Sequence, residues 1–172
     1  MNKLVGKFAP VLALTAAVTV LGGATASAAP AELPYLGPDG YKSLKLGMSE
    51  ADALATGLLT EQETIGSCVS YRFVTGEGSM PAYSGVLFDE NRKLNSIGAT
   101  SRMLTREGAW PNMRISDVKV IYPQLTQDPD QPYLHKTPVP GNAGAKYHFV
   151  LDEHDVAYTF SLTSTRDAAC GA

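Results

Sequence analysis

The sequence predicts an α+β fold made of two tandem repeats, each a pair of short helices packed on an antiparallel β-sheet. Two short segments recur in the second half at offsets of 65 and 63 residues, which indicates an internal duplication. In both halves, apolar residues at helical spacing precede segments in which apolar and polar residues alternate. That alternation leaves one sheet face apolar, so we expect the helices to cover it. The two sheets can also join into one continuous sheet.

The first 28 residues have the pattern of a secretory signal peptide. Lys3 and Lys7 precede an apolar run from Phe8 to about Leu21, and the small residues of positions 24–29 follow. The run is shorter than the roughly 20 residues that span a bilayer. We therefore expect cleavage after Ala28 or Ala29, a secreted bacterial protein, and no stable membrane insertion afterwards. The alternative is an uncleaved membrane anchor.

The rest of the chain divides into a lead-in and two repeats. Residues 29–39 are rich in proline and alanine and predict an extended lead-in, followed by repeat 1 (40–104) and repeat 2 (105–172). Cleavage leaves roughly 144 residues, a length that suits one domain or two small repeats. The formal net charge of −3 becomes more negative by two when Lys3 and Lys7 are removed. With no basic cluster, nucleic acid is excluded as a partner.

Repeat 1 begins with the predicted helix pair. The spacing of Tyr41 and Leu44 predicts a short helix that ends at Gly47. Ser49, followed three residues later by Asp52, forms a capping-box pattern and predicts a second helix. Its apolar face consists of Ala51, Leu54, Ala55 and Leu58. The remainder of the repeat predicts strands at 68–74 and a hairpin at 85–101 around the turn 89–92.

Repeat 2 echoes this order. Asn112-Met113 corresponds to Gly47-Met48, and glycine and asparagine are the residues that most readily adopt positive φ. The segment 149–154 echoes 86–91. A helix face of Ile115, Val118 and Tyr122 is stopped by Pro123. The final hairpin predicts one buried face, made of Tyr147, Phe149, Leu151, Val156, Tyr158, Phe160 and Leu162.

The two cysteines, Cys68 and Cys170, predict one disulfide, because paired cysteines are typical of exported chains. Such a bond would hold the C-terminus against the first half of the chain and close a loop of about 100 residues. The alternative is two free thiols or a redox pair, although no C-x-x-C spacing is present.

The residue types that support catalysis occur without a catalytic pattern. The turn 152–155 combines three acids with His154, but consecutive turn residues rarely converge on one metal ion, and a solvated turn is the simpler interpretation. His135 and His148 fall on predicted strands, and no serine lies in a G-x-S-x-G elbow. We therefore expect no enzyme activity, metal or cofactor. The alternatives are a small secreted hydrolase with an unrecognised site and a structural protein of the cell envelope.

The segment Tyr41–Leu54 resembles the repeat opening of the β-lactamase inhibitory protein family, an aromatic residue, then Ile/Leu, then Gly-Met-Ser/Thr and a helix. The same opening is similar to that of outer-membrane assembly lipoproteins of the BamE/SmpA type. The resemblance implies tandem repeats whose sheets and loops bind a target enzyme. It directs attention to the loops Thr75–Pro81, which contains Glu77, and Thr137–Gly144, which has no aromatic anchor. In the inhibitor each repeat closes its own disulfide, whereas here one pair would join repeat 1 to the tail.

The single tryptophan completes the candidate site. Trp110 lies beside Pro111, with Arg114 nearby, and either packs between helix and sheet or anchors a partner. We select Glu77, Trp110 and Arg114 as candidate binding residues. The function expected from the sequence is a secreted, non-enzymatic module that binds an extracellular or envelope protein, with inhibition of an extracellular enzyme as its specific form.

Overall fold

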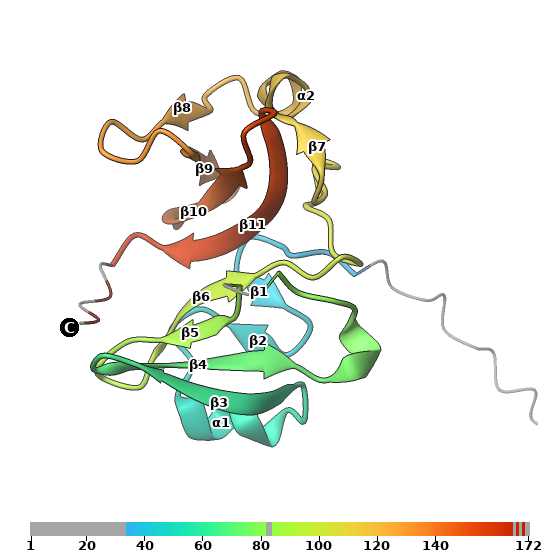
Figure 1. Cartoon of the computed structure of the whole chain (residues 1–172). Helices are drawn as coiled ribbons and strands as arrows, with labels where there is room; N and C mark the ends of the chain where they lie inside the picture. The colour runs from blue at the N-terminus through green and yellow to red at the C-terminus, as the bar shows by residue number, and fades with distance from the viewer. Residues whose placement is uncertain (1–33, 82–83, 167, 169, 171–172) are drawn as a thin grey trace, which may run out of the picture. The chain divides into compact units, whose positions relative to one another are not determined.

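The structure is a computed structural model that describes residues 34–81, 84–166, 168 and 170 (Figure 1). The expected signal peptide and the first part of the lead-in, up to residue 33, lie outside the described residues. The described residues belong to one compact unit. Within this part of the chain, neither the length nor the apolar character of any helix suffices to cross a membrane.

Most strands belong to one antiparallel sheet, in the order β3-β4-β5-β6-β11-β10-β9-β8, with β7 paired to β11 (Figure 1). The sheet is continuous because β6 pairs with β11, the last strand of each half. Its strands are β3 (Leu59–Ile65), β4 (Cys68–Phe73), β5 (Val86–Phe88), β6 (Leu94–Gly98), β7 (Met113–Arg114), β8 (Thr126–Gln127), β9 (Leu134–Val139), β10 (Asn142–Leu151) and β11 (Val156–Ser164). The antiparallel sheet is therefore confirmed, and the two short helices beside it are compatible with the α+β class.

The predicted pair of helices in each repeat is wrong. Each half has one α-helix, α1 (Glu50–Ala55) or α2 (Ile115–Ile121), and the first half adds the 3-10 turn η1 (Thr75–Glu77). Where the first helix was expected, β1 (Gly40–Tyr41) and β2 (Leu44–Lys45) form a two-stranded hairpin. Tyr41 and Leu44 are both buried, so their spacing reflects a tight turn. Gly40 has φ 156°, and a Cβ there would lie 1.9 Å from the Leu44 carbonyl oxygen.

The capping box of α1 is confirmed, but its predicted apolar face is not. Ser49 Oγ accepts a hydrogen bond of 3.2 Å from the Asp52 amide. Ala53 is the buried residue of α1, and Leu54 remains 41% exposed. A helix of six residues follows the geometry of its cap and flanking turns, so a periodicity of four residues does not fix its orientation. In α2, Val118 is buried as predicted, and the helix ends before Pro123.

One face of the sheet forms the core beneath the two helices and the β1–β2 hairpin. Ala53, Val118, Tyr41 and Leu44 belong to the same buried cluster as alternate residues of the strands. In the final hairpin, Tyr147, Phe149 and Leu151 are buried as predicted. On β11 the buried apolar residues are Ala157, Phe160 and Leu162, because a bulge opposite Val150 and Leu151 turns Val156 and Tyr158 off the core.

The two halves repeat the same strand register. Val86 pairs with Ile97 and Leu87 with Ser96; 63 residues later, Phe149 pairs with Phe160 and Val150 with Thr159. In both hairpins the register then shifts by one residue, so that Phe88 pairs with Leu94 and Leu151 pairs with Ala157. The bulge therefore occurs at the same position in each half. Gly98 pairs with Ser161, a residue 63 positions away, so corresponding strands meet antiparallel at the join between the halves.

The corners before the helices also repeat. Gly47 and Asn112 have φ values of 80° and 71°, as the glycine–asparagine exchange predicted. The Gly47 amide donates to the Leu94 carbonyl, and the Asn112 amide donates to the Ala157 carbonyl, both at 2.7 Å. In the turns that follow β5 and β10, Arg92 and Asp155 have φ values of 57° and 58°.

Candidate binding surface

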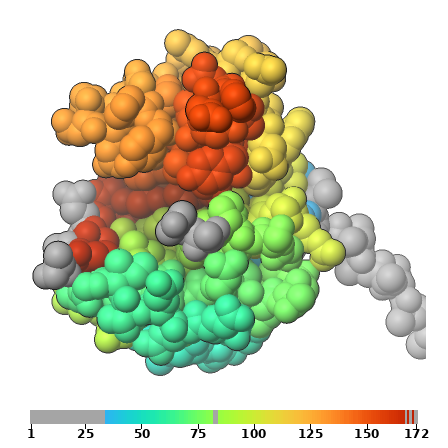
Figure 2. All heavy atoms as spheres, in the orientation of Figure 1, coloured from blue at the N-terminus to red at the C-terminus, as the bar shows by residue number. Residues whose placement is uncertain are grey.

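The sheet face that points away from the helices is here called the open face. Paired residues cross it in a row that begins with an acid and has a lysine near its far end: Glu63, Ser70, Leu87, Ser96, Thr163, Lys146 and Pro138. Atoms of the first half (cyan to green) and of the second half (yellow to red) occupy separate regions in Figure 2. The row therefore runs from the first half of the chain to the second.

A hollow of about 220 Å³ lies at the centre of the open face. Small and hydroxyl-bearing residues predominate in its lining, which consists of Ile65, Ser70, Ser84, Gly85, Leu87, Ser96, Gly98, Val150, Thr159, Phe160 and Ser161. At two of these positions the neighbouring serine side chains leave no space for a residue larger than glycine. A Cβ at Gly85 would lie 2.2 Å from Ser70 Oγ, and one at Gly98 would lie 2.1 Å from Ser84 Oγ.

Several hydroxyls of this hollow have no hydrogen-bond partner within the described part of the chain. The Thr159 hydroxyl oxygen is buried and unpartnered. For Ser70 and Ser84, no described residue makes a side-chain hydrogen bond, whereas Ser96 and Ser161 both contact the Thr163 hydroxyl, at 2.9 and 3.2 Å. Buried polar groups are normally paired, so the Thr159 hydroxyl is unusual, and the partly exposed hydroxyls of Ser70 and Ser84 can form hydrogen bonds to an external group.

A second hollow, of about 490 Å³, adjoins the first and shares Ile65, Ser70 and Ser84 with it. Glu61, Glu63 and Arg72 are among its lining residues. The Arg72 guanidinium lies 3.7 Å from the Glu61 carboxylate and donates to the Met80 carbonyl at 3.2 Å. Glu63 forms no ion pair with a described residue, so this end of the open face carries an unneutralised acid.

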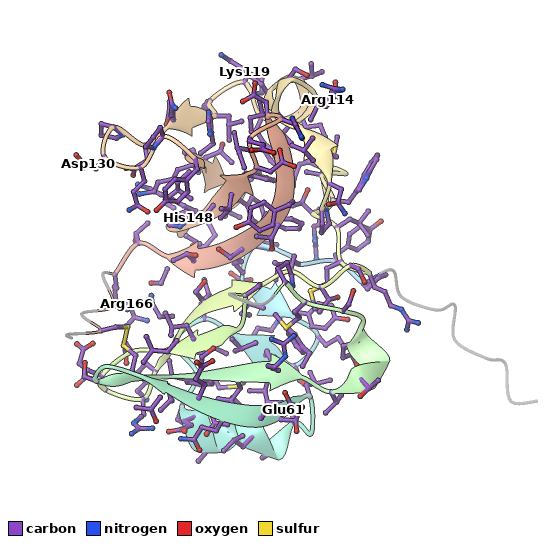
Figure 3. All side chains as sticks on the ribbon, in the orientation of Figure 1. Glu61, Arg114, Lys119, Asp130, His148 and Arg166 are labelled. Carbon is purple, nitrogen blue, oxygen red and sulfur yellow. A yellow bond between two sulfur atoms is a disulfide. The ribbon has the colours of Figure 1, made fainter. Side chains whose placement is uncertain are left out.

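The opposite end of the open face is basic. Lys136 forms an ion pair with Asp128, whereas Lys146 is exposed and has no ion-pair partner in the described ranges. His148 lies on β10, as Lys146 does, and pairs with Lys136 on β9 (Figure 3). Burial, aided by Lys136 and Lys146, lowers the pKa of His148 to about 4. Its imidazole is therefore neutral at pH 7.

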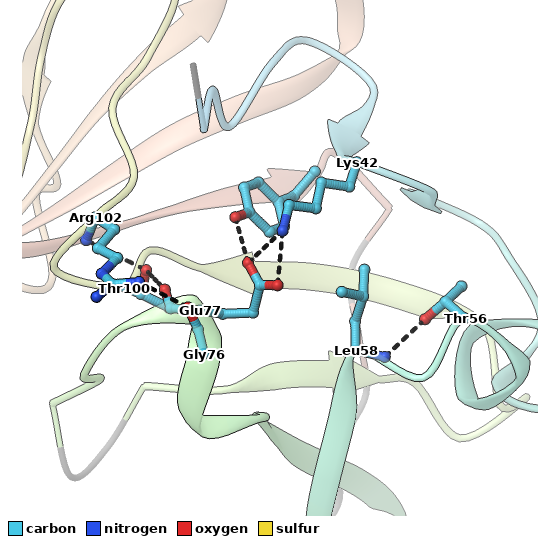
Figure 4. Close-up of polar contacts among 8 residues, drawn as sticks. Lys42, Thr56, Leu58, Gly76, Glu77, Thr100 and Arg102 are labelled. Atoms are coloured by element: carbon cyan, nitrogen blue, oxygen red, sulfur yellow. Dashed lines mark hydrogen bonds and ion pairs between the residues drawn. The ribbon is translucent and has the colours of Figure 1, made fainter. Parts of the chain in front are cut away.

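Glu77, a predicted binding residue, is held inside an internal network (Figure 4). Its carboxylate accepts hydrogen bonds from the Tyr41 hydroxyl at 2.6 Å and from the Lys42 ammonium at 2.6 and 2.7 Å, and its side chain is 12% exposed. Partial burial acts to raise the pKa of Glu77, but the bonds from Lys42 and Tyr41 outweigh it and lower the pKa. The carboxylate joins η1 to the β1–β2 hairpin.

Trp110 and Arg114 lie in the second half. Trp110 is 53% exposed, and its backbone amide contacts Met113 Sδ at 3.4 Å. Arg114 is exposed at the start of α2, and its backbone pairs with Val156 (Figure 3). Among the described residues, no hydrogen bond, ion pair or ring contact joins Glu77, Trp110 and Arg114 to one another. The structure therefore does not bring the three residues together into one site.

The structure joins Cys68 and Cys170 in a disulfide, with 5.1 Å between their Cα atoms and 102 positions between them in sequence (Figure 3). This agrees with the predicted pairing. Because Cys68 begins β4, the bond links the segment that follows β11 to a strand of the first half. The chain is thereby closed across β5 and β6.

The two predicted loops differ in kind. Thr75–Pro81 begins with η1 and packs against the segment after β6, where the Thr100 hydroxyl donates to the Glu77 carbonyl at 2.6 Å. Thr137–Gly144 is a hairpin, because it contains the end of β9, a tight turn at Pro140 and Gly141, and the start of β10. Gly141 supplies the positive φ, 82°, that such a turn needs.

The acidic turn 152–155 is a hydrogen-bonded hairpin turn. The Asp152 carboxylate accepts bonds of 2.9 Å from the amides of both His154 and Val156, and these bonds lower its pKa. Asp89 makes the corresponding bonds to Asn91 and Lys93 in the first half. The described residues include no group of three or more His, Cys, Asp or Glu side chains placed to hold a metal ion.

The hydroxyls of the open face were not among the predicted site residues. Ser70 and Ser96 lie on the strands predicted at 68–74 and 85–101, but single serines and glycines on a strand give no signal for a hollow. The usable signal was that Ser70, Gly85, Ser96 and Gly98 all alternate with core residues on adjacent strands.

Comparisons of this chain with family models, with curated proteins and with solved structures found no match.

Proposed function

We propose that the mature chain is a secreted, non-enzymatic module that binds another extracellular or envelope protein through the open face of its sheet. Its specific form is an inhibitor of an extracellular enzyme. The observation that carries this proposal is the hollow lined by small, hydroxyl-bearing residues, three of which have no partner within the described chain. A large side chain of a partner fits such a hollow and supplies the missing hydrogen bonds.

The distribution of charge supports the same surface. Glu63 at one end and Lys146 at the other give the open face opposite charges about a neutral centre. Charge complementarity of this kind guides the orientation of a partner and makes association sensitive to salt. The charged groups elsewhere, such as Glu77 and Asp152, have internal partners and are better explained by stability.

The repeated register supports a tandem-repeat architecture like that of the β-lactamase inhibitory protein. The shared bulge, the paired corners at Gly47 and Asn112, and the Gly98–Ser161 pair fit a duplication of one unit. That unit contains one helix and four sheet strands, to which the second half adds the two-residue strand β7. We infer that the halves are tandem copies, and that the sheet they form together is the binding element.

The test is direct binding by the mature chain, measured with an optical biosensor against purified β-lactamases and secreted proteases, alongside inhibition assays. Leu87→Arg fills the hollow, and we expect it to weaken binding by at least about tenfold. Val120→Arg is the matched control, because Val120 is an apolar residue of α2 that is 80% exposed. Absence of binding and inhibition throughout the panel removes the inhibitor form, and equal loss in both variants contradicts the open face as the site.

A further inference from the structure

The register of the two halves equates Tyr71 with His135. Tyr71 pairs with Val86 on β5, and His135 pairs with Phe149 on β10, where Val86 and Phe149 occupy corresponding positions. Directly paired residues point to the same side of a sheet, so both side chains lie on the helix-covered face. The corresponding helix residues are Glu50 and Ile115, whose amides donate to the carbonyls of Arg92 and Asp155.

In the first half, this position is filled and its polar atoms are paired. Tyr71 is buried, and its hydroxyl donates to Glu50 Oε1 at 2.5 Å. Arg92 donates to Glu50 Oε2 at 3.2 Å. A phenol, a carboxylate and a guanidinium thus close the space between α1 and β4.

In the second half, the same space is left open. Ile115 replaces the carboxylate and the shorter His135 replaces the phenol. The His135 Nδ1 atom is buried and has no hydrogen-bond partner in the described chain. A cavity of about 290 Å³ remains, lined by Ile115, Ser116, Lys119, Leu125, Gln127 and His135.

The polar groups at this cavity favour an anion. Lys119 makes no ion pair with any described residue, and the Gln127 amide already donates to the Pro132 carbonyl. Burial lowers the pKa of His135; Lys119 acts in the same direction, whereas Asp155 opposes it. Asp155 is not among the lining residues, so the ammonium of Lys119 is the charge that a ligand in the cavity meets.

We propose that this cavity binds a small monocarboxylate, with its carboxylate between the Lys119 ammonium and the His135 imidazole and its alkyl chain against Ile115 and Leu125. The site is separate from the open face, so the inference goes beyond the proposed function and does not depend on it. The cavity is near the lower limit of small-molecule sites, which suits a ligand of a few carbon atoms.

The experiment titrates the mature chain at pH 7 with acetate, butyrate and hexanoate, followed by calorimetry and by NMR of the histidine rings. We expect affinity to rise about twofold to fourfold per methylene until the cavity is full. We also expect the His135 ring signals to shift and the pKa of His135 to rise, because a bound anion stabilises the imidazolium. Lys119→Met should weaken butyrate binding by about tenfold or more.

Two further variants make the result specific. His135→Tyr should abolish binding, because it places in the cavity the side chain that fills the corresponding space in the first half. Lys146→Met removes a lysine of the open face and should leave butyrate affinity unchanged. Leu87→Arg should also leave it unchanged, which separates this result from the open-face test.

The proposal is overturned by any of four outcomes. These are equal affinity for butylamine and butyrate, equal affinity for inorganic phosphate with no dependence on chain length, no effect of Lys119→Met, or an equal loss in Lys119→Met and Lys146→Met.

Discussion

On the helix-covered face, the first half places Tyr71 where the second half places His135. On the open face the order of size is reversed, since Ser70 and Gly85 of the first half correspond by register to Leu134 and His148 of the second. Each half therefore has a hollow on a different side of the same sheet. The central hollow of the open face depends on the small residues of β4, of β6 and of the segment just before β5, and the cavity under α2 depends on His135.

This comparison separates the backbone features that both halves share from the side chains that differ between them. Backbone features recur in both halves, including the bulge, the positive-φ corners and the aspartate turns. The side chains that fill the two faces do not recur. Function is thus better sought where the halves differ than where they agree.

The largest expected effect comes from the bond that ties only the first half to the tail. The double variant Cys68→Ser/Cys170→Ser should lower the free energy of unfolding by about 4 kcal/mol, since a loop of about 100 residues is released in the unfolded chain. Urea unfolding of the mature chain measures it, with the unaltered protein under reducing conditions as a parallel test. A loss below about 1 kcal/mol would show that the tail contributes little.

The second prediction concerns His148, which has Gly85 as its counterpart. The unfolded chain protonates this imidazole near pH 6.5, but the folded protein does so only at about pH 4. The folded protein therefore has its full free energy of unfolding above about pH 6.5. This free energy should fall by up to about 3 kcal/mol as the pH drops towards 4.

His148→Gln should flatten this part of the stability profile, measured by urea unfolding at several pH values. The same replacement at the exposed His154, in the turn that follows β10, is the matched control. An unaltered slope in His148→Gln would contradict the assignment.

The third prediction compares the corresponding residues of the helix-covered face. Tyr71→Phe should cost about 1–2 kcal/mol, because Glu50 loses a hydrogen bond donated to its carboxylate. His135→Phe removes an unpartnered buried nitrogen and should be neutral or stabilising by up to about 1 kcal/mol. Thermal unfolding of both variants measures the two changes in stability. A larger loss of stability in His135→Phe than in Tyr71→Phe would mean that the imidazole has a structural partner.

The smallest effect concerns the two corners. Gly47→Ala should cost about 1 kcal/mol, since the added Cβ disfavours the left-handed backbone. Asn112→Gly should change stability by less than about 0.5 kcal/mol, because both residues adopt positive φ readily. Equal and large losses in both variants would show that the Asn112 side chain, and not its φ, matters.

Much of the sheet could be predicted from the sequence because alternation and turn residues are local signals. The hairpin of β10 and β11, the capping box at Ser49 and the positive φ at Asn112 all came from such signals. The β1–β2 hairpin did not, because Tyr41 and Leu44 have a spacing that suits a helical turn and a tight hairpin equally. The bulge at Tyr158 depends on cross-strand register, which alternation does not report.

The candidate site was harder to predict. Glu77 was selected from a loop position, but its hydrogen bonds to Tyr41 and Lys42 span more than thirty residues and cannot be foreseen locally. The cavity at His135 required the comparison of two registers, which needs a structure. Whether a nitrogen is buried and lacks a hydrogen-bond partner depends on tertiary packing, which the sequence does not report.

The pairing of Gly98 with Ser161 also determines which strand edges remain available to other chains. An isolated half would expose the edge of β6 at residues 96–98 or of β11 at residues 161–163, and an exposed strand edge is a template for aggregation. Because these two edges are paired to each other, the outer edges of the described sheet are β3 and β8. The β8 edge is two residues long, and β3 carries Glu61 and Glu63, so both ends of the sheet discourage unwanted strand addition.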